Sequence, residues 1–139
     1  MATRTATQVG SGVQPKGLRV GLVAVTSTFS LAAAQSLVAG DVIQMVKVPA
    51  NATLVYMGVS GGSGDALVTV GDGVDDDRYL SAVTMSSAQP LIRTINTAYV
   101  PYTYSTDDTI DIAVSTVSVA TITGGFNMIA IFSMNPGVT

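Results

Sequence analysis

The sequence has 139 residues, of which 47% are hydrophobic and only 11% charged, and its formal net charge is −3. This length predicts one domain around a single core, and the low charge predicts that a partner covers part of the surface, since soluble domains usually carry about 25% charged residues. No basic stripe is present to neutralise phosphates, which argues against a nucleic-acid partner, and no apolar run approaches the ~18 residues that a membrane span needs.

Residues 1–17 are rich in Thr, Gly and Gln and show no hydrophobic alternation. We predict that they form an extended N-terminal arm, followed by a single β-sandwich domain over residues 18–139. The arm carries Arg4 and Lys16, two of only six basic residues, but few large apolar groups, so we expect it to add little to the core. We predict that it contacts another chain, and that deleting residues 2–14 leaves the sandwich folded but weakens attachment to a partner. A frayed tail is the alternative.

Short segments rich in Val, Ile, Thr and Tyr, separated by Gly, Pro, Asn and Asp, predict β-strands. In chain order they are residues 18–25, 41–48, 52–59, 66–70, 78–84, 90–95, 109–115, 119–123 and 126–134. The last two flank a pair of glycines and predict a hairpin. Residues 29–40 are the one helix-like stretch, which leaves open a short helix that ends at Gly40 or a loop. Eight or nine short strands without crossover helices predict an all-β fold, an antiparallel β-sandwich of jelly-roll-like type.

The stretch "GDGVDDDRYL" (71–80) concentrates acidic residues in a chain that has few. A calcium loop, a catalytic carboxylate pair and a turn between strands are the three interpretations. The spacing does not match the D-x-D-x-D-G calcium loop, and the chain has no Glu to complete one. We therefore predict an acidic turn that binds no metal, partly neutralised by Arg78. The turn comprises Asp72, Asp75, Asp76 and Asp77.

Catalytic chemistry has little support in the composition. The chain has no His and no Cys, so the commonest general base near neutral pH and the thiolate nucleophile are both missing. The D-T-G, G-x-S-x-G and P-loop motifs are absent as well. We predict that the protein is not an enzyme and needs no cofactor.

Three of the five tyrosines, Tyr99, Tyr102 and Tyr104, gather around the segment "PYTYSTDD" (101–108). Tyrosine combines a large contact area with a hydroxyl group, which suits a partner interface. The alternative is that the rings cover one end of the sandwich. A carbohydrate-binding β-sandwich would use the same rings as a stacking platform, although the chain has no Trp.

The runs "AAAQSLVAGDVIQMVKVPANATLVYMGVSG" and "ALVTVGDGVDDDRYL", between residues 32 and 80, carry a resemblance to a known class. They resemble small virion proteins of tailed bacteriophages, in the class of head decoration or cement proteins. The resemblance implies a β-sandwich on the outer surface of an icosahedral capsid, where it bridges capsomers of the major capsid protein. On this reading the acidic turn is a strand connector. A tail, collar or fibre module of a virion is the alternative.

The partners expected on this interpretation are the major capsid protein and further copies of the chain. Self-association is predicted from the excess of apolar residues, most simply as a two-fold dimer, with a trimer as the alternative. The residues expected at partner interfaces are Arg4, Lys16, Tyr99, Tyr102 and Tyr104.

Overall fold

The computed structural model describes residues 2–6, 21–31, 36–61, 66–85, 93–94, 101–117 and 125–134. Within these ranges the regular structure is entirely β, and they include no helix long and apolar enough to cross a membrane. The strands are β1 (Thr3–Thr5), β2 (Gly21–Phe29), β3 (Val42–Val48), β4 (Ala52–Gly61), β5 (Ala66–Asp72), β6 (Leu80–Met85), β7 (Arg93–Thr94), β8 (Tyr102–Thr103), β9 (Asp108–Val117) and β10 (Phe126–Met134).

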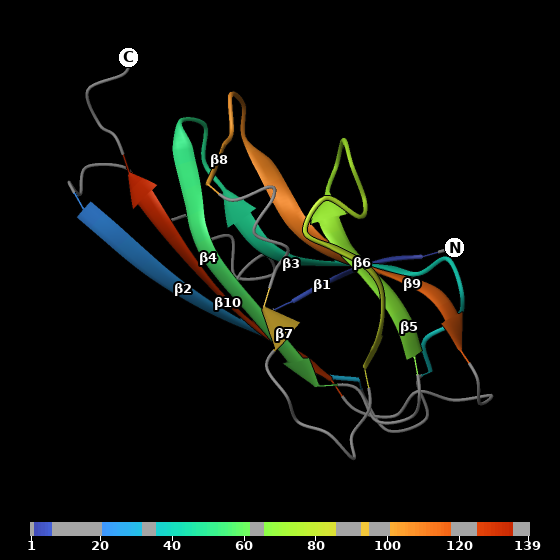
Figure 1. Cartoon of the computed structure of the whole chain (residues 1–139). Helices are drawn as coiled ribbons and strands as arrows, with labels where there is room; N and C mark the ends of the chain where they lie inside the picture. The colour runs from blue at the N-terminus through green and yellow to red at the C-terminus, as the bar shows by residue number, and fades with distance from the viewer. Residues whose placement is uncertain are drawn as a thin grey trace.

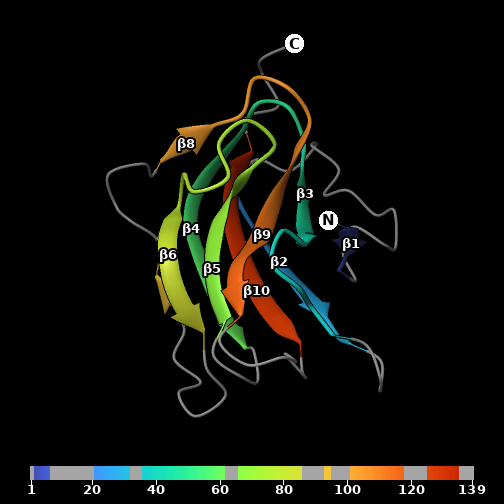
Figure 2. The same ribbon diagram turned by 90° about the vertical axis from the view of Figure 1, so that its right-hand side faces the viewer.

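The strands form two sheets that pack face to face (Figures 1 and 2). The first sheet has the order β1-β3-β9-β5-β6, and the second has the order β2-β10-β4-β7, with β8 also paired to β4. The predicted antiparallel β-sandwich is confirmed. A jelly roll requires two four-stranded sheets built from Greek keys. Strands β3-β9-β5-β6 and β2-β10-β4-β7 give each sheet four strands in this count, and the chain changes sheet at every step from β2 to β5. The jelly-roll type stays a prediction.

The core lies between the sheets and follows from the alternation of each strand. Along β10, Phe126, Met128 and Phe132 are buried, whereas Asn127 between them is exposed. The predicted alternation of β9 is also present, because Ile110, Ile112 and Val114 are buried in the same core. Burying one such side chain contributes about 1.5–3 kcal/mol, so the two rows account for much of what holds the sheets together.

Strand β1 places the first residues of the chain within the first sheet. It pairs in parallel with β3, Thr3 opposite Val42 and Thr5 opposite Gln44. Ala6 is only 2% exposed and joins the core. This differs from the expected arm, because residues 2–6 find backbone partners along the open edge of β3 and do not need large side chains to bind there. Residues 7–17, with Lys16, lie outside the described residues.

Asp41 explains why this short strand is held. Its buried carboxylate accepts hydrogen bonds from the backbone N–H groups of Ala2 and Val38, both at 3.1 Å. Arg4 lies over the same group, with Nε 3.6 Å from Oδ2, and also donates to the carbonyl of Ser36 at 3.3 Å. A buried carboxylate needs such partners, so β1 and the turn before β3 stabilise each other.

Several strand boundaries differ from the predicted ones. Strand β2 continues to Phe29, because Thr26–Thr28 extend the alternation instead of ending it. Strand β6 begins at Leu80, since Arg78 and Tyr79 belong to the preceding loop. The described parts of 29–40 contain the end of β2, a bridge and a turn, as the loop alternative expected.

Only one strand of the predicted C-terminal hairpin, residues 126–134, belongs to the described residues. Strand β10 pairs with β2 along one side and with β4 along the other. Its predicted partner, residues 119–123, lies outside the described residues.

Candidate functional site

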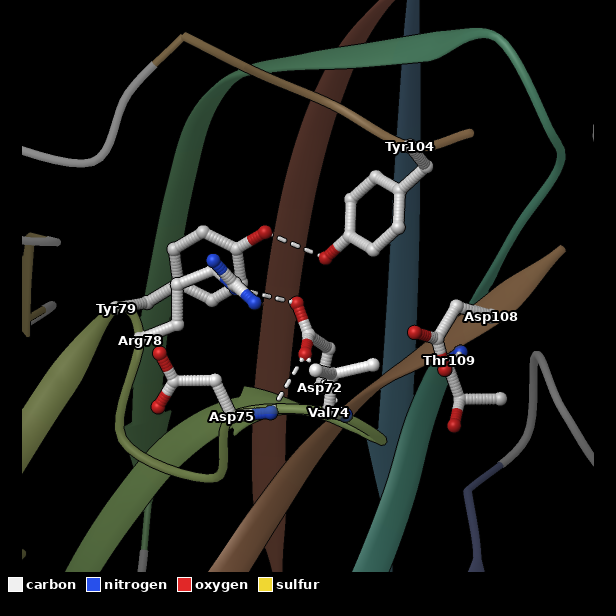
Figure 3. Close-up of polar contacts among 8 residues, drawn as sticks. All are labelled: Asp72, Val74, Asp75, Arg78, Tyr79, Tyr104, Asp108 and Thr109. Atoms are coloured by element: carbon white, nitrogen blue, oxygen red, sulfur yellow. Dashed lines mark hydrogen bonds and ion pairs between the residues drawn. The ribbon is translucent and has the colours of Figure 1, made fainter. Parts of the chain in front are cut away.

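The acidic loop between β5 and β6 is organised around a buried carboxylate (Figure 3). Oδ1 of Asp72 accepts hydrogen bonds from the backbone N–H groups of Val74 and Asp75 at 3.1 and 3.0 Å. Oδ2 accepts a hydrogen bond from Nε of Arg78 at 2.6 Å. Gly71 is required beside it, since a Cβ there would lie 2.0 Å from the carbonyl oxygen of Asp75. The loop therefore folds back onto the end of β5.

Arg78 continues this network into a group of tyrosines. Its guanidinium lies 4.2 Å from the ring centre of Tyr102, which in turn meets Tyr104 edge to face at 5.0 Å. The hydroxyls of Tyr104 and Tyr79 hydrogen-bond to each other (Figure 3). Burial lowers the pKa of Arg78, but the hydrogen bond and charge of Asp72 outweigh it and raise that pKa. Burial raises the pKa of both Tyr79 and Tyr104 well above the ordinary value, so both hydroxyls stay neutral and serve packing.

Two expectations for the site residues need correction. Asp72 is not part of a solvated turn, since its side chain is 1% exposed and paired with Arg78. Tyr104 does not present its ring to a partner, because the residue is buried in the core. Arg78, which was expected to neutralise part of the turn, pairs with Asp72 in a buried position, and Tyr79 satisfies the hydroxyl of Tyr104.

The remaining predicted residues are distributed over separate places. Asp76 and Asp77 are exposed and Asp75 is half-buried, and carboxylate oxygens of the three lie within 4.8 Å of one another. Such exposed clusters are common without an ion. Tyr102 is half-buried and Arg4 binds Asp41. Lys16 and Tyr99 lie outside the described residues.

Asp111 is a titratable group that the sequence analysis did not single out. It lies on the central strand β9, in register with Gln44 on one side and Gly71 on the other. Its Oδ1 is buried without a hydrogen-bond partner among the described residues. Burial raises the pKa of Asp111 to about 6, assisted by the charges of Asp108 and Asp72, while a hydrogen bond with Thr109 acts in the opposite direction. The alternation of β9 was the available signal, since it directs Asp111 away from the core.

The two sheets differ sharply in charge. Strands β2, β10 and β4 contain no charged residue in their 28 positions, 9, 9 and 10 respectively. The first sheet carries Arg4, Lys47, Asp72, Asp108 and Asp111 on its strands. In the described part of the second sheet only Arg93, on the short strand β7, is charged. Apart from Arg93, the charged residues on the described strands therefore belong to the first sheet.

The outer face of β2, β10 and β4, here called the uncharged face, carries apolar side chains where an exposed sheet face usually carries polar ones. Leu22 is 70% exposed and Tyr56 is 38% exposed. Ile129 and Ile131 lie on the strand between them, half-buried. Outward positions occupied by Leu, Ile and Tyr were the signal in the sequence from which this surface could have been found.

One end of the uncharged face is hollowed into a shallow groove. Its volume is about 310 Å³, and it crosses the three strands at the level where Thr28 pairs with Asn127 and Asn127 with Ser60. The hydroxyl of Thr28 donates to Oδ1 of Asn127 at 2.9 Å. The groove is lined by Thr26, Ser27, Thr28, Gly58, Ser60, Asn127, Met128 and Ile129. It offers neutral hydrogen-bonding groups beside apolar surface, which suits a protein partner better than a charged ligand.

The sequence matches no protein-family model and no curated protein. Among solved structures, the chain is similar to one in the capsid of Ralstonia phage GP4, with a TM-score of 0.76 and 13% identity over 96% of this chain and 98% of that one. The chain shares its fold with phage capsid chains. A chain of the cyanophage Pam1 capsid asymmetric unit matches with a TM-score of 0.72 and 14% identity, covering 88% of this chain and 91% of that one.

A third neighbour comes from the acidic stable capsid structure of Helicobacter pylori bacteriophage KHP30. It has a TM-score of 0.59 and 14% identity, with 86% of this chain and 90% of that one covered. Each likeness spans nearly the whole of both chains, so it concerns the complete sandwich and not a local motif. The resemblance to phage capsid-related proteins is thereby confirmed at the level of the fold.

Proposed function

We propose that the protein is a virion structural protein that decorates and stabilises the outer surface of a phage capsid by bridging capsomers of the major capsid protein. The observation that carries this proposal is the uncharged face, on a fold shared with phage capsid chains. Such a face loses little by desolvation when it docks, because no charge has to leave water. It gains from burying Leu22, Tyr56 and the two isoleucines of β10.

The segregation of charge favours one orientation. The uncharged face would lie against the capsid, and the first sheet, with its aspartates, would face solvent and keep the particle soluble. Many copies on one shell would make individually weak contacts effective together. The role is structural and not enzymatic. Nothing in the network around Asp72 provides a general base, because that carboxylate is already committed to Arg78.

Self-association and the remaining predicted contacts belong to the same proposal. We expect a homodimer, with a trimer as the alternative, and contacts to neighbouring chains through residues 7–17, which include Lys16. Tyr99 stays a predicted contact residue. A tail, collar or fibre module would use the same face on a different partner. The carbohydrate-binding alternative is weakened, because Tyr104 is buried and Tyr102 is already stacked on Arg78.

Co-sedimentation with expanded empty capsids tests the proposal. The wild-type chain should sediment with the capsids, and Asn127→Asp should bind at least tenfold more weakly, since it places one nearly isosteric charge on the uncharged face. The matched control is Thr84→Asp, which adds the same charge at an exposed position of β6 in the first sheet. Wild-type protein that stays in the supernatant would overturn capsid decoration. Equal weakening by both variants would overturn the assignment of the face.

A further inference from the structure

Strand β2 forms one edge of the second sheet. All nine of its residues pair with β10, from Gly21 opposite Met134 to Phe29 opposite Phe126. Among the described residues no strand pairs with its other side, and in Figure 1 it ends the layer of β4, β10 and β2. Over Gly21–Thr26, this edge therefore has a row of backbone donors and acceptors for which the described residues supply no strand partner. Such a row is a template for another strand.

The other sheet edges in the described structure are protected and this one is not. Strand β1 has three residues and carries Arg4, and β7 has two. Strand β6 has six residues, meets β5 through a register shift, and contains Ala82 at a φ of 50°. Charges, short length and irregular backbone are the usual means of blocking edge pairing. Strand β2 has no charged residue, no proline and an unbroken register with β10.

The inner side chains of β2 are also incompletely covered. Val23 and Val25 point toward the core but are only half-buried. Their register partners on β10, Phe132 and Ala130, are fully buried. Burial therefore falls off toward the edge, and one more strand beside β2 would complete it.

We propose that β2 pairs with β2 of a second copy, antiparallel about a two-fold axis at Ala24. This register places Leu22 opposite the partner's Thr26, and Val23 opposite the partner's Val25. Because side chains alternate with a period of two, a two-fold axis centred on a residue keeps each face continuous. The half-buried valines meet each other on the core side, and the uncharged residues meet on the outer side.

A second copy suits this edge because β2 supplies the strand that the edge requires. The partner strand must present β-branched residues toward the core and uncharged residues outward, and Leu22–Thr26 does both. No like charges face each other across the axis, although each copy carries a net charge of −3. The contact is isologous and closes on itself, so it yields a dimer and not a filament. It also doubles the uncharged face. The inference stands independently of what that face binds.

Cysteine cross-linking tests the register directly, because the chain has no cysteine of its own. In the proposed dimer the two Ala24 Cα atoms lie about 4.5–5.5 Å apart, within the range for a disulfide. Ala24→Cys should give a disulfide-linked dimer as the main product of mild oxidation. The control is Ile131→Cys, in register with Ala24 but one strand further in. Its two copies would lie about 14 Å apart, three strand spacings, and should not cross-link.

A mixture of two cysteine variants tests the register between the two copies of β2. Leu22→Cys and Thr26→Cys should each form no disulfide on oxidation when present alone, because identical residues are displaced by about 13 Å along the strands. A mixture of the two should give the heterodimer. Cross-linking of Ile131→Cys as efficient as that of Ala24→Cys, or none with Ala24→Cys, would overturn the proposal.

The oligomeric state gives a second readout. Wild-type protein should sediment as a dimer, and Ala24→Lys should raise the dissociation constant at least tenfold with an unchanged circular dichroism spectrum, since like charges would face each other at the axis. A wild-type monomer at every concentration, or a trimer, would overturn the two-fold contact. Neither result depends on capsid binding, so this proposal and the proposed function can fail separately.

Discussion

Asp72 and Arg78 close the loop between β5 and β6 with an ion pair of 2.6 Å that is almost entirely shielded from water. The remaining oxygen of Asp72 accepts two backbone N–H groups of the same loop. A carboxylate with all its partners in place is inexpensive to bury, and one without them is not. The pair therefore makes an acidic stretch into a fixed connector between two strands.

Replacing Asp72 should destabilise the fold strongly. Asp72→Ala leaves the Arg78 guanidinium without its counter-ion and two N–H groups without an acceptor, and we expect the free energy of unfolding to fall by about 3 kcal/mol or more. Urea denaturation measures it. The control, Asp77→Ala, changes an exposed aspartate of the same loop and should cost less than about 0.5 kcal/mol. Similar losses in both variants would contradict a specific role for Asp72.

Gly71→Ala tests the close approach of the loop to β5. The added methyl would meet the backbone carbonyl of Asp75, which cannot move aside like the end of a side chain. We expect a loss of about 3 kcal/mol in the free energy of unfolding. Val74→Ala, at an 86% exposed position of the same loop, is the matched control and should change little. A wild-type melting temperature for Gly71→Ala would show that the loop does not pack this way.

Asp111 should make stability depend on pH. Its pKa is raised to about 6 in the folded chain from an ordinary 3.8, so between those pH values the folded state binds more protons than the unfolded state. Its contribution is favourable at low pH and is lost as pH rises through 6.

Asp111→Asn should remove this dependence. The gain in melting temperature over wild type should be larger at pH 7.5 than at pH 4.5, as measured by thermal unfolding. A gain that is the same at both pH values would show that Asp111 is not strained when charged.

The N-terminal residues are expected to contribute to stability. Arg4→Ala removes the cation over the buried Asp41 and should lower the free energy of unfolding by about 1–2 kcal/mol. Deleting residues 2–6 should lower it further, since it also uncovers the edge of β3 and removes Ala6 from the core. Chemical denaturation of both variants is the measurement. Full stability of the deletion would restore the view that the whole of residues 1–17 is an independent arm.

No metal should be needed for folding. The three clustered aspartates lie in an exposed part of the loop, whereas Asp72, the buried one, is satisfied by Arg78. Chelator should leave the melting temperature unchanged. If chelator lowered it by many degrees, and Asp75→Asn with Asp76→Asn reproduced the loss, the loop would be an ion site after all.

The sequence predicted the strands of the core well, because burial imposes a period of two that is visible in segments such as 109–115 and 126–134. It did not distinguish the buried residues of the site from the exposed ones. Asp72 and Asp77 look alike in the sequence. They differ in the folded chain, where Asp72 is buried and paired with Arg78 whereas Asp77 is exposed. Tyr104 likewise owes its burial to Tyr79, 25 residues earlier in the chain. The uncharged face was missed for a similar reason, since it is assembled from β2, β4 and β10, which are far apart in the chain.

The segregation of charge also determines how contacts of this protein should respond to their surroundings. The proposed attachment through β2, β4 and β10 would contain no ion pairs to be screened, so it should persist at ionic strengths that dissolve charge-based assemblies. Its driving force is hydrophobic and weakens on cooling. A capsid stabilised in this way would lose less of its stability at high salt concentration than at low temperature.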